Sequence, residues 1–353
     1  MTNTVNTADL VSMKDLGLPE DRCYVIAEVA QAHDGSLGQA HAYIDAIGDS
    51  GADAVKFQTH IASAESTLQE PWRIPFSPQD ETRFEYWRRM EFTPDQWAGL
   101  ARHARERDLE FLSSPFSTDA VDLLNKLNVR VWKIPSGETN NPVLLDAVWS
   151  TGRPVLYSSG MTDLSEMAEL IELTRLRGIP YGVFQCSSSY PCPPELWGLQ
   201  TVEVLRQTFG CPAGFSDHSG GIYAGLAAAA LGANFIEVHV TFSRQMFGPD
   251  VSSSITIAEL RQLVEGVRLV HTALRANPDK TTLPPQIEPL KNIFGHSLAL
   301  THDMAAGSVI NQNHLTLKKP AGGIAFAERN AVVGRRLRVD KSATQLLSFD
   351  DFE

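Results

Sequence analysis

Two lysines and two histidines each lie at or near the end of a short apolar run of the sequence. Lys56 lies in AVKFQT and Lys133 in VWKIPS, while His218 ends AGFSDH and His239 lies in FIEVHVTF. A charged group is costly inside a protein unless it is paired or bound to a ligand. If both ammonium groups lie near one axis, an anion between them would offset their repulsion.

Hydroxyl and amide side chains stand at similar places in neighbouring runs. They are Gln58, Ser114, Ser136 and Ser158. Such groups fill the acceptor directions of a phosphate that compact ammonium charges leave open. The pattern predicts a phosphate site or a phosphate-plus-carboxylate site. Two alternatives stay open: each lysine pairs with Glu28 or Glu138, or a desolvated lysine attacks a carbonyl, as in a Schiff-base aldolase.

The two histidines stand beside acidic residues, with Asp217 before His218 and Glu237 two residues before His239. Two imidazoles on neighbouring strand ends can share a divalent metal, with water and substrate oxygens completing its coordination. We predict Mn²⁺, with Mg²⁺ or Co²⁺ as alternatives. A single histidine would favour a hydrogen-bonded structural role instead. His33, which follows the first run, is expected to orient Glu28 or to line the pocket.

The elements that must position these groups follow from an alternation along the chain. Eight β-branched runs start near Tyr24, Ala54, Leu109, Val131, Pro154, Tyr181, Ala213 and Phe235. Amphipathic stretches such as 37–51 and 95–108 lie between them, and the first ends in a glycine, as helices often do. This alternation predicts a (β/α)8 TIM barrel, whose catalytic residues project from the carboxyl ends of the strands. An open doubly wound sheet is the alternative.

The length of 353 residues suits a barrel of about 250 residues plus an appendage. We predict an N-terminal extension over 1–20, a barrel over 21–276, a proline-rich linker over 277–291 and a small β-rich domain over 292–353. The longest insertion, 60–92, is expected at the rim, where it would shape or cover the mouth of the barrel.

Composition excludes several classes of protein. A net charge of −12 argues against general binding to nucleic acid, which needs a basic face. No apolar run approaches the roughly 20 residues that span a bilayer. The polar first twenty residues lack a signal pattern, so we expect a cytoplasmic protein. Cys23, Cys186, Cys192 and Cys211 have irregular spacings, and we expect free thiols.

Nine short blocks carry a resemblance to a known family. In order they are AEVAQAHDGSLGQA, GADAVKFQT, FLSSPFS, KIPSGE, SSGM, SSSYPCPP, GFSDHSG, LGANFIEVHVTF and GPD. They resemble the sialic acid synthase family, which includes legionaminic and pseudaminic acid synthases and spore-coat polysaccharide proteins. The tail, with AAGSVI, LKKPAGGI and VVGRRLRVDKSA, is similar to the antifreeze-like (SAF) domain of these enzymes. The resemblance covers 21–353.

The resemblance implies a reaction. Phosphoenolpyruvate attacks the aldehyde of an open-chain N-acylated hexosamine, N-acetylmannosamine-like, through its C3. Water adds at C2, phosphate leaves by C–O cleavage, and a nine-carbon 3-deoxy-2-keto acid results. It further implies a domain-swapped homodimer, in which the SAF domain of one chain covers the barrel of the other and Lys319 reaches the partner's site.

The resemblance also implies roles for individual residues. Phosphoenolpyruvate is expected at Lys56, Gln58, Ser114, Lys133, Ser136 and Ser158. The sugar is expected at Glu138, Ser188, Tyr190, Ser216, Asp250 and Lys319. The metal is expected at His218 and His239, and Glu28 would manage the water or a proton. The expected catalytic set is therefore Glu28, Lys56, Lys133, His218 and His239.

Several positions depart from the family pattern. Ala32 stands where many members have asparagine, Val238 replaces a lysine, and Val251 replaces a histidine. Lys319 replaces an arginine, so a point charge stands in place of a forked guanidinium. Ser188 stands where an amide often contacts the sugar. The phosphate and metal positions are kept, so the departures leave the acceptor defined only as an acylated hexosamine.

Rival interpretations remain. One is a Schiff-base aldolase and another is an enzyme like 3-deoxy-octulosonate phosphate synthase, which needs basic residues for a phosphorylated acceptor. The arginines of the insertion, Arg73, Arg83, Arg88 and Arg89, are interpreted as a solvated face, although they keep a phosphorylated acceptor open. A third rival is a non-catalytic carbohydrate-binding protein.

Overall fold

The computed structural model describes residues 10–276 and 278–353. The chain divides after Ala276 into two compact units. Residues 1–9 of the predicted N-terminal extension and Asn277 of the predicted linker lie outside the described residues.

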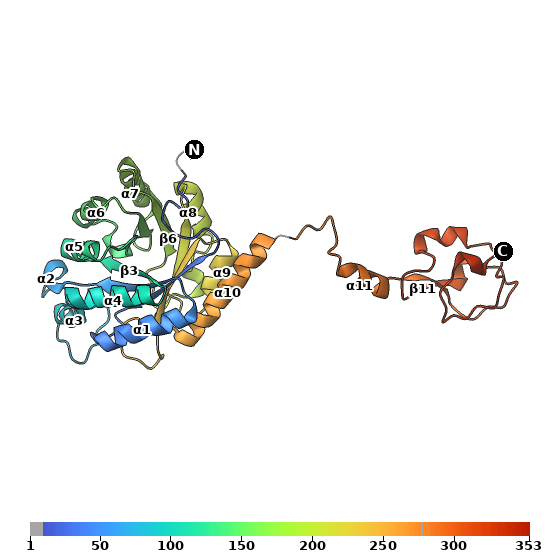
Figure 1. The fold of residues 1–353 in the computed structure, drawn as a ribbon, viewed down its shortest axis with the longest axis horizontal. Helices are drawn as coiled ribbons and strands as arrows, with labels where there is room; N and C mark the ends of the chain where they lie inside the picture. The colour runs from blue at the N-terminus through green and yellow to red at the C-terminus, as the bar shows by residue number, and fades with distance from the viewer. Residues whose placement is uncertain (1–9, 277) are drawn as a thin grey trace. The chain divides into compact units, whose positions relative to one another are not determined.

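Strands form at all eight runs that the sequence predicts, and helices lie outside them (Figure 1). The strands are β1 (Tyr24–Ala30), β2 (Ala54–Thr59), β3 (Glu110–Pro115), β4 (Trp132–Ile134), β5 (Val155–Ser158), β6 (Tyr181–Cys186), β7 (Ala213–Asp217) and β8 (Phe235–Thr241). A two-residue strand, β9 (Ile255–Thr256), pairs with the end of β8.

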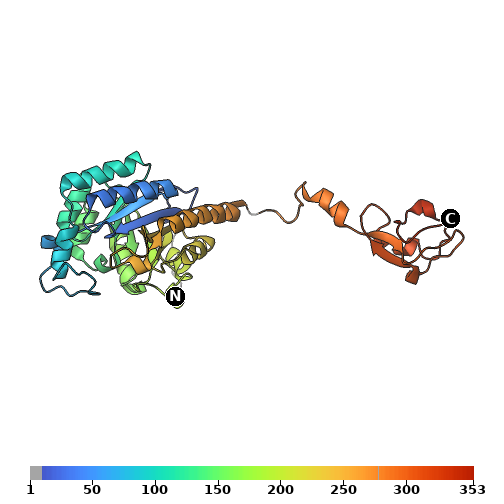
Figure 2. The same cartoon turned by 90° about the horizontal axis from the view of Figure 1, so that it is seen from below.

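The helices of the first unit follow the strands in turn, and Figure 2 shows the unit turned by 90°, again with helices outside the strands. They are α1 (Leu37–Ser50), α2 (Ala62–Glu65), α3 (Arg83–Met90), α4 (Pro94–Glu106), α5 (Thr118–Lys126), α6 (Pro142–Trp149), α7 (Leu164–Leu176), α8 (Thr201–Phe209), α9 (Tyr223–Ala230) and α10 (Ile257–Ala276). The predicted glycine end of α1 is present, because Gly51 adopts the left-handed φ of 78° that a helix C-cap requires.

The sheet runs in the order β3-β2-β1-β8-β7-β6-β5-β4, and its neighbouring strands are parallel. The first strand pairs with the eighth, which an open doubly wound sheet would not do. The ends of this path, β3 and β4, lie side by side. The sheet is therefore a nearly closed eight-stranded barrel, and the predicted fold class is confirmed.

The barrel interior changes from apolar to polar within two residues along the strands. An apolar layer consists of Ile26, Ala54, Leu112, Val131, Leu156, Phe184 and Phe235. Side chains of a strand return to the same face every second residue. The next interior layer therefore contains Glu28, Lys56, Ser114, Lys133, Ser158 and Glu237, and each of these six is buried. The strand period thus places the polar residues on top of an apolar plug.

One glycine makes room for this plug. A Cβ at Gly214 would lie 1.9 Å from the ring of Phe235 and 2.4 Å from its carbonyl oxygen. Met13, Leu16 and Leu18, from the segment predicted as an N-terminal extension, belong to the same apolar cluster. Residues 13–18 therefore pack against the barrel interior.

The second unit has its own small core, which includes Leu298, Ile310, Leu337 and Phe352. Its two strands, β10 (Ser297–Leu300) and β11 (Leu315–Lys318), pair antiparallel. The predicted strand-like pieces 307–311 and 334–339 contribute only isolated bridges, at Val309 with Arg336 and at Leu337 with Phe352. Helix α11 (Ile287–Phe294) begins inside the predicted linker.

Two further predictions from the sequence can be compared with the structure. All four cysteines are buried and free, as predicted. Among the residues that the structure describes, no helix has the length and apolar content that crossing a membrane requires.

Candidate active site

The register of the barrel strands aligns the predicted catalytic residues. Glu28 on β1 stands opposite Lys56 on β2 and opposite His239 on β8. Gln58 stands opposite Ser114, and Ser216 stands opposite Glu237. Residues from β1, β2, β3, β7 and β8 therefore meet at one level of the barrel, near the carboxyl ends of the strands.

Both ammonium groups are buried and share one carboxylate. Lys56 and Lys133 are 3% and 1% exposed. Their Nζ atoms lie 3.5 and 3.4 Å from the same Oε1 of Glu237. Lys56 also forms an ion pair with Glu28. The alternative that protein carboxylates pair with the lysines is therefore present in part: Lys56 pairs with Glu28, as it expected, and both lysines share Glu237, which it did not name.

The charges of this cluster alter the pKa values of its members. Burial and the charge of Lys133 lower the pKa of Lys56, Glu237 offsets them in part, and the resulting pKa is about 7. Burial raises the pKa of Glu237, but Lys133 and Lys56 outweigh this effect and lower it to about 2. Glu237 is therefore a carboxylate at neutral pH.

Serine hydroxyl groups that could donate hydrogen bonds to a phosphate lie around the cluster. The Nζ of Lys133 donates to the Oγ of Ser158 at 2.6 Å. The Oγ of Ser136 accepts from the backbone N of Gly160 at 3.2 Å. The Oγ of Ser114 is buried and has no hydrogen-bond partner among the described residues. A buried hydroxyl without a partner is costly, and it would gain a hydrogen bond from a bound anion.

The two imidazoles lie side by side. The ring centres of His218 and His239 are 5.1 Å apart, and both residues are buried. The Nδ1 of His218 lies 3.0 Å from the carbonyl oxygen of Ser187. A carbonyl only accepts, so Nδ1 donates its proton there and Nε2 keeps a free lone pair. The Nδ1 of His239 lies 3.9 Å from the Oδ2 of Asp250.

This geometry fits a metal held by two neutral histidines. Burial and the proximity of His239 lower the pKa of His218 to about 3, and burial also lowers the pKa of His239. A backbone carbonyl that holds the second ring nitrogen is the usual partner of a metal-binding histidine. Within 10–276 and 278–353 no group of three or more His, Cys, Asp or Glu residues could hold a metal.

A cavity of about 390 Å³ opens beside these groups. Seven predicted site residues line it: Gln58, Ser136, Glu138, Ser188, Tyr190, His239 and Asp250. Burial and a second carboxylate, Glu65, raise the pKa of Glu138. Tyr190 packs on His218 with 4.1 Å between ring centres. The cavity therefore joins four of the predicted sugar residues, Glu138, Ser188, Tyr190 and Asp250, to His239.

Other predicted residues are buried behind the cavity wall. Glu28 accepts from the Nε2 of Gln58 at 2.9 Å, and Ser216 lies 3.3 Å from Glu237. His33 does not line the cavity; its Nδ1 accepts from the backbone N of Gly35, and its ring packs on Phe92.

Lys319 belongs to the second unit, where its Nζ lies 5.0 Å from the ring centre of Phe294.

The insertion after β2 shapes the cavity, as expected from its position. Trp72, Arg73, Phe76, Arg83, Tyr86 and Trp87 all line it. The interpretation of its arginines as a solvated face holds in part, because Arg73 and Arg88 are exposed whereas Arg83 and Arg89 are only partly exposed. Arg73 pairs with Asp250 at 2.7 Å, and Arg83 pairs with Glu70 at 3.2 Å. Both lie at the cavity, where carboxylates can hold them because the insertion folds back over the barrel mouth.

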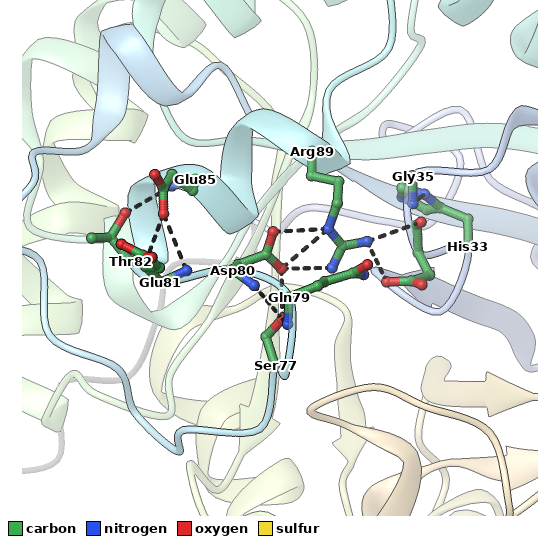
Figure 3. Close-up of polar contacts among 10 residues, drawn as sticks. His33, Gly35, Ser77, Gln79, Asp80, Glu81, Thr82, Glu85 and Arg89 are labelled. Atoms are coloured by element: carbon green, nitrogen blue, oxygen red, sulfur yellow. Dashed lines mark hydrogen bonds and ion pairs between the residues drawn. The ribbon is translucent and has the colours of Figure 1, made fainter.

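A second arginine contact fixes the insertion to the barrel (Figure 3). Arg89 of α3 donates to both carboxylate oxygens of Asp80, at 2.8 to 3.1 Å. Its Nη1 donates to the carboxylate and the carbonyl of Asp34, in the loop after β1. Arg88 is exposed and matches the solvated interpretation.

Sequence reasoning gave no role to two residues that the structure places at the site. Glu237 stands two residues before His239 on the same strand, a spacing that puts both side chains on one face. That spacing was a usable signal for a third group in the barrel interior. His60 is buried and contacts Gln58, and nothing in the sequence around it indicates this.

Comparisons with known proteins agree with this architecture. The NeuB family model matches residues 43–278, and the SAF domain model matches residues 296–353. The chain is 32% identical over 317 residues to N,N'-diacetyllegionaminic acid synthase from Campylobacter jejuni, covering 88% of this chain and 94% of that protein. It is 34% identical over 300 residues to human N-acetylneuraminate-9-phosphate synthase, covering 84% and 83%.

A solved structure is similar to this chain over almost its whole length. The spore coat polysaccharide biosynthesis protein of Bacillus subtilis matches with a TM-score of 0.64 and 28% identity, covering 94% of this chain and 95% of that chain. The resemblance that the sequence blocks carry is confirmed, and so is the prediction of an enzyme of this kind.

Proposed function

Because this chain belongs to the NeuB family, we propose that it condenses phosphoenolpyruvate with an open-chain N-acylated hexosamine to a nine-carbon 3-deoxy-2-keto acid. The reaction consumes one water and releases one phosphate. The observation that supports this proposal best is the buried pair Lys56 and Lys133, which lies beside unpaired Ser114 and near the two imidazoles.

The proposed anion site has a charge balance that bears on binding. Two carboxylates, Glu28 and Glu237, already offset the positive charge of Lys56 and Lys133. A phosphate and a carboxylate on one ligand would make the site strongly negative. A divalent cation at His218 and His239 would offset this excess, so we expect phosphoenolpyruvate to bind more tightly when the metal is present.

The residues of the chain have separate tasks in this proposal. The phosphate and the carboxylate would be held by Lys56, Lys133, Ser114, Ser136 and Ser158. Gln58 would bind the same ligand from the cavity side. Glu28 would take or give a proton at the water that adds to C2. The cavity lined by Glu138, Ser188, Tyr190 and Asp250 would hold the acceptor, with Ser216 buried behind it.

His218 and His239 are the proposed metal ligands, and Mn²⁺ is the proposed ion. A cation held by these two residues would supply Lewis-acid polarisation of the acceptor aldehyde. C3 of phosphoenolpyruvate then forms the new carbon–carbon bond, and the C2–O bond to phosphate breaks after water has added. Phosphate leaves with the bridging oxygen.

We further propose that the enzyme is a homodimer in which the SAF domain of one chain covers the barrel of the other. Lys319 would then reach the partner's sugar site, in place of a forked guanidinium. Light scattering on the purified protein tests the dimer. The cytoplasmic setting stays a prediction from the sequence.

One assay tests the proposed reaction. The protein is mixed with Mn²⁺, with phosphoenolpyruvate carrying ¹⁸O at the bridging position, and with a panel of free and phosphorylated N-acylated hexosamines. We expect phosphate release with at least one acceptor and the label in the phosphate. No phosphate with any acceptor would favour the carbohydrate-binding alternative, and label left on carbon would contradict C–O cleavage.

One alternative has an observation in its favour. Burial lowers the pKa of Lys56 to about 7, and a lysine of that kind can form a Schiff base with a carbonyl substrate. Borohydride treatment in the presence of pyruvate distinguishes the two functions. Covalent capture of pyruvate on Lys56 would favour the aldolase.

A further inference from the structure

His60 occupies an unusual position directly after β2. The residue is 4% exposed although it begins the long insertion. Its ring lies between two aromatic rings, 3.9 Å from Trp87 at an interplanar angle of 13° and 4.3 Å from Phe116 at 18°. Both faces of the imidazole are therefore covered, and only its two nitrogen edges can make polar contacts.

Each nitrogen edge faces a specific partner. The Nδ1 atom lies 2.5 Å from the Oε1 of Glu65, and the Nε2 atom lies 3.3 Å from the Oε1 of Gln58. The other carboxylate oxygen of Glu65 accepts from the backbone N of Ile61 at 3.1 Å. Glu65 is thus held in place by its own helix start and by the histidine.

The orientation of the Gln58 amide follows from these contacts. Its Nε2 donates to the Oε1 of Glu28 at 2.9 Å, so its Oε1 must point toward His60. An amide oxygen only accepts, so the Nε2 of His60 donates to it, and a second proton lies in the hydrogen bond between Nδ1 and Glu65. Rotation of the amide by half a turn would place its oxygen against the Glu28 carboxylate and its NH₂ group against the N–H of His60.

We propose that His60 and Glu65 are a positioning pair that fixes the Gln58 amide, and through it Glu28, for phosphoenolpyruvate binding. This role rests on the proposed phosphoenolpyruvate site. Glu65 and Trp87 both belong to the insertion, on α2 and α3. The pair therefore makes the geometry of Gln58 depend on the folded insertion, which also forms the wall of the cavity.

A double-mutant cycle on phosphoenolpyruvate binding tests this proposal. Calorimetry with Mn²⁺ present compares the wild type, His60→Phe, Gln58→Met and the double variant. Phenylalanine keeps the aromatic stack and removes both nitrogens. We expect His60→Phe to weaken binding about tenfold, equal to ~1.4 kcal/mol, and to have almost no further effect on the Gln58→Met background. The KM for the acceptor should not change.

Two results would overturn the positioning role. One is a His60→Phe variant that binds phosphoenolpyruvate as tightly as the wild type. The other is a full additive loss on the Gln58→Met background, which a merely structural role would produce. His103→Phe on α4 is the matched control and should bind as the wild type does. If His60→Phe does not fold, Glu65→Gln replaces it, and unchanged binding would again overturn the role.

The same experiment separates this proposal from the proposed function. A wild-type protein that does not bind phosphoenolpyruvate at all contradicts the proposed function itself. A wild type that binds it, together with a His60→Phe variant that binds equally well, contradicts only the positioning pair.

Discussion

Replacement of Glu237 by glutamine is the sharpest test of the charge cluster in the barrel. The substitution keeps the shape of the side chain and an oxygen that can accept from Ser216, but it removes the charge between the two lysines. Lys133 then has no carboxylate partner among the described residues, while Lys56 keeps Glu28. The cluster loses one negative charge.

The magnitude follows from the two separations. At 3.4 and 3.5 Å, each attraction is ~5 kcal/mol at an effective dielectric constant of about 20. The loss of one member of a buried ion pair costs ~3–5 kcal/mol of folding free energy. For a unit of this size, 1 kcal/mol lowers the melting temperature by about 2–4 °C. We expect Glu237→Gln to melt ~6–20 °C below the wild type.

The loss of this negative charge should have the opposite effect on anion binding. Inorganic phosphate or phosphoenolpyruvate, without metal, should raise the melting temperature of Glu237→Gln more than that of the wild type. Thermal unfolding with and without each anion measures both effects. The control is Glu259→Gln, which breaks an exposed pair with Arg244 and should cost at most ~1 kcal/mol. A Glu237→Gln variant that melts with the wild type and gains no more from phosphate would refute the reasoning.

Five further predictions concern the metal site and the insertion. Replacement of both His218 and His239 by glutamine should abolish Mn²⁺ binding in calorimetry while the far-ultraviolet circular dichroism stays unchanged; retained binding would exclude these ligands. Because burial lowers the pKa of both histidines, that of His218 to about 3, wild-type Mn²⁺ affinity should change less than about tenfold between pH 7.5 and 5.5. Unfolded histidines take up protons below pH ~6.5, whereas the buried folded ones stay neutral, so the free energy of unfolding decreases as the pH falls from ~6.5 toward 3. In urea titrations, a variant without both imidazoles should therefore lose less free energy of unfolding over that range. Arg73→Ala should raise the acceptor KM several-fold and leave the phosphoenolpyruvate KM unchanged, because it frees Asp250 at the cavity; equal changes in both would argue against a local effect. Arg89→Met should cost ~1–3 kcal/mol and speed proteolysis between 66 and 82, since it removes charge-assisted hydrogen bonds on both sides; an unchanged cleavage rate would contradict that link.

The sequence predicts the barrel because its signals are local and repeated. Each strand is a short apolar run, and each helix between strands has its own periodicity and caps. The alternation of side chains along β1, β2 and β8 is also local, so the residue pattern alone assigns Glu28, Lys56 and His239 to strand ends. The small second unit was harder, since pieces such as 334–339 have strand-like composition but too few partners to form a ladder.

What the sequence by itself determined is therefore the set of strands and the polar types that end them. Only the tertiary structure decided which charges meet. Glu237 lies between Lys56 and Lys133 because β8 closes the barrel against β1, a pairing between strands more than 200 residues apart. Arg73 and His60 depend on the irregular insertion, which has no period to read. Arg73 contacts Asp250 and His60 contacts Gln58 only after the fold has brought these segments together. These contacts depend on tertiary packing and not on local propensity.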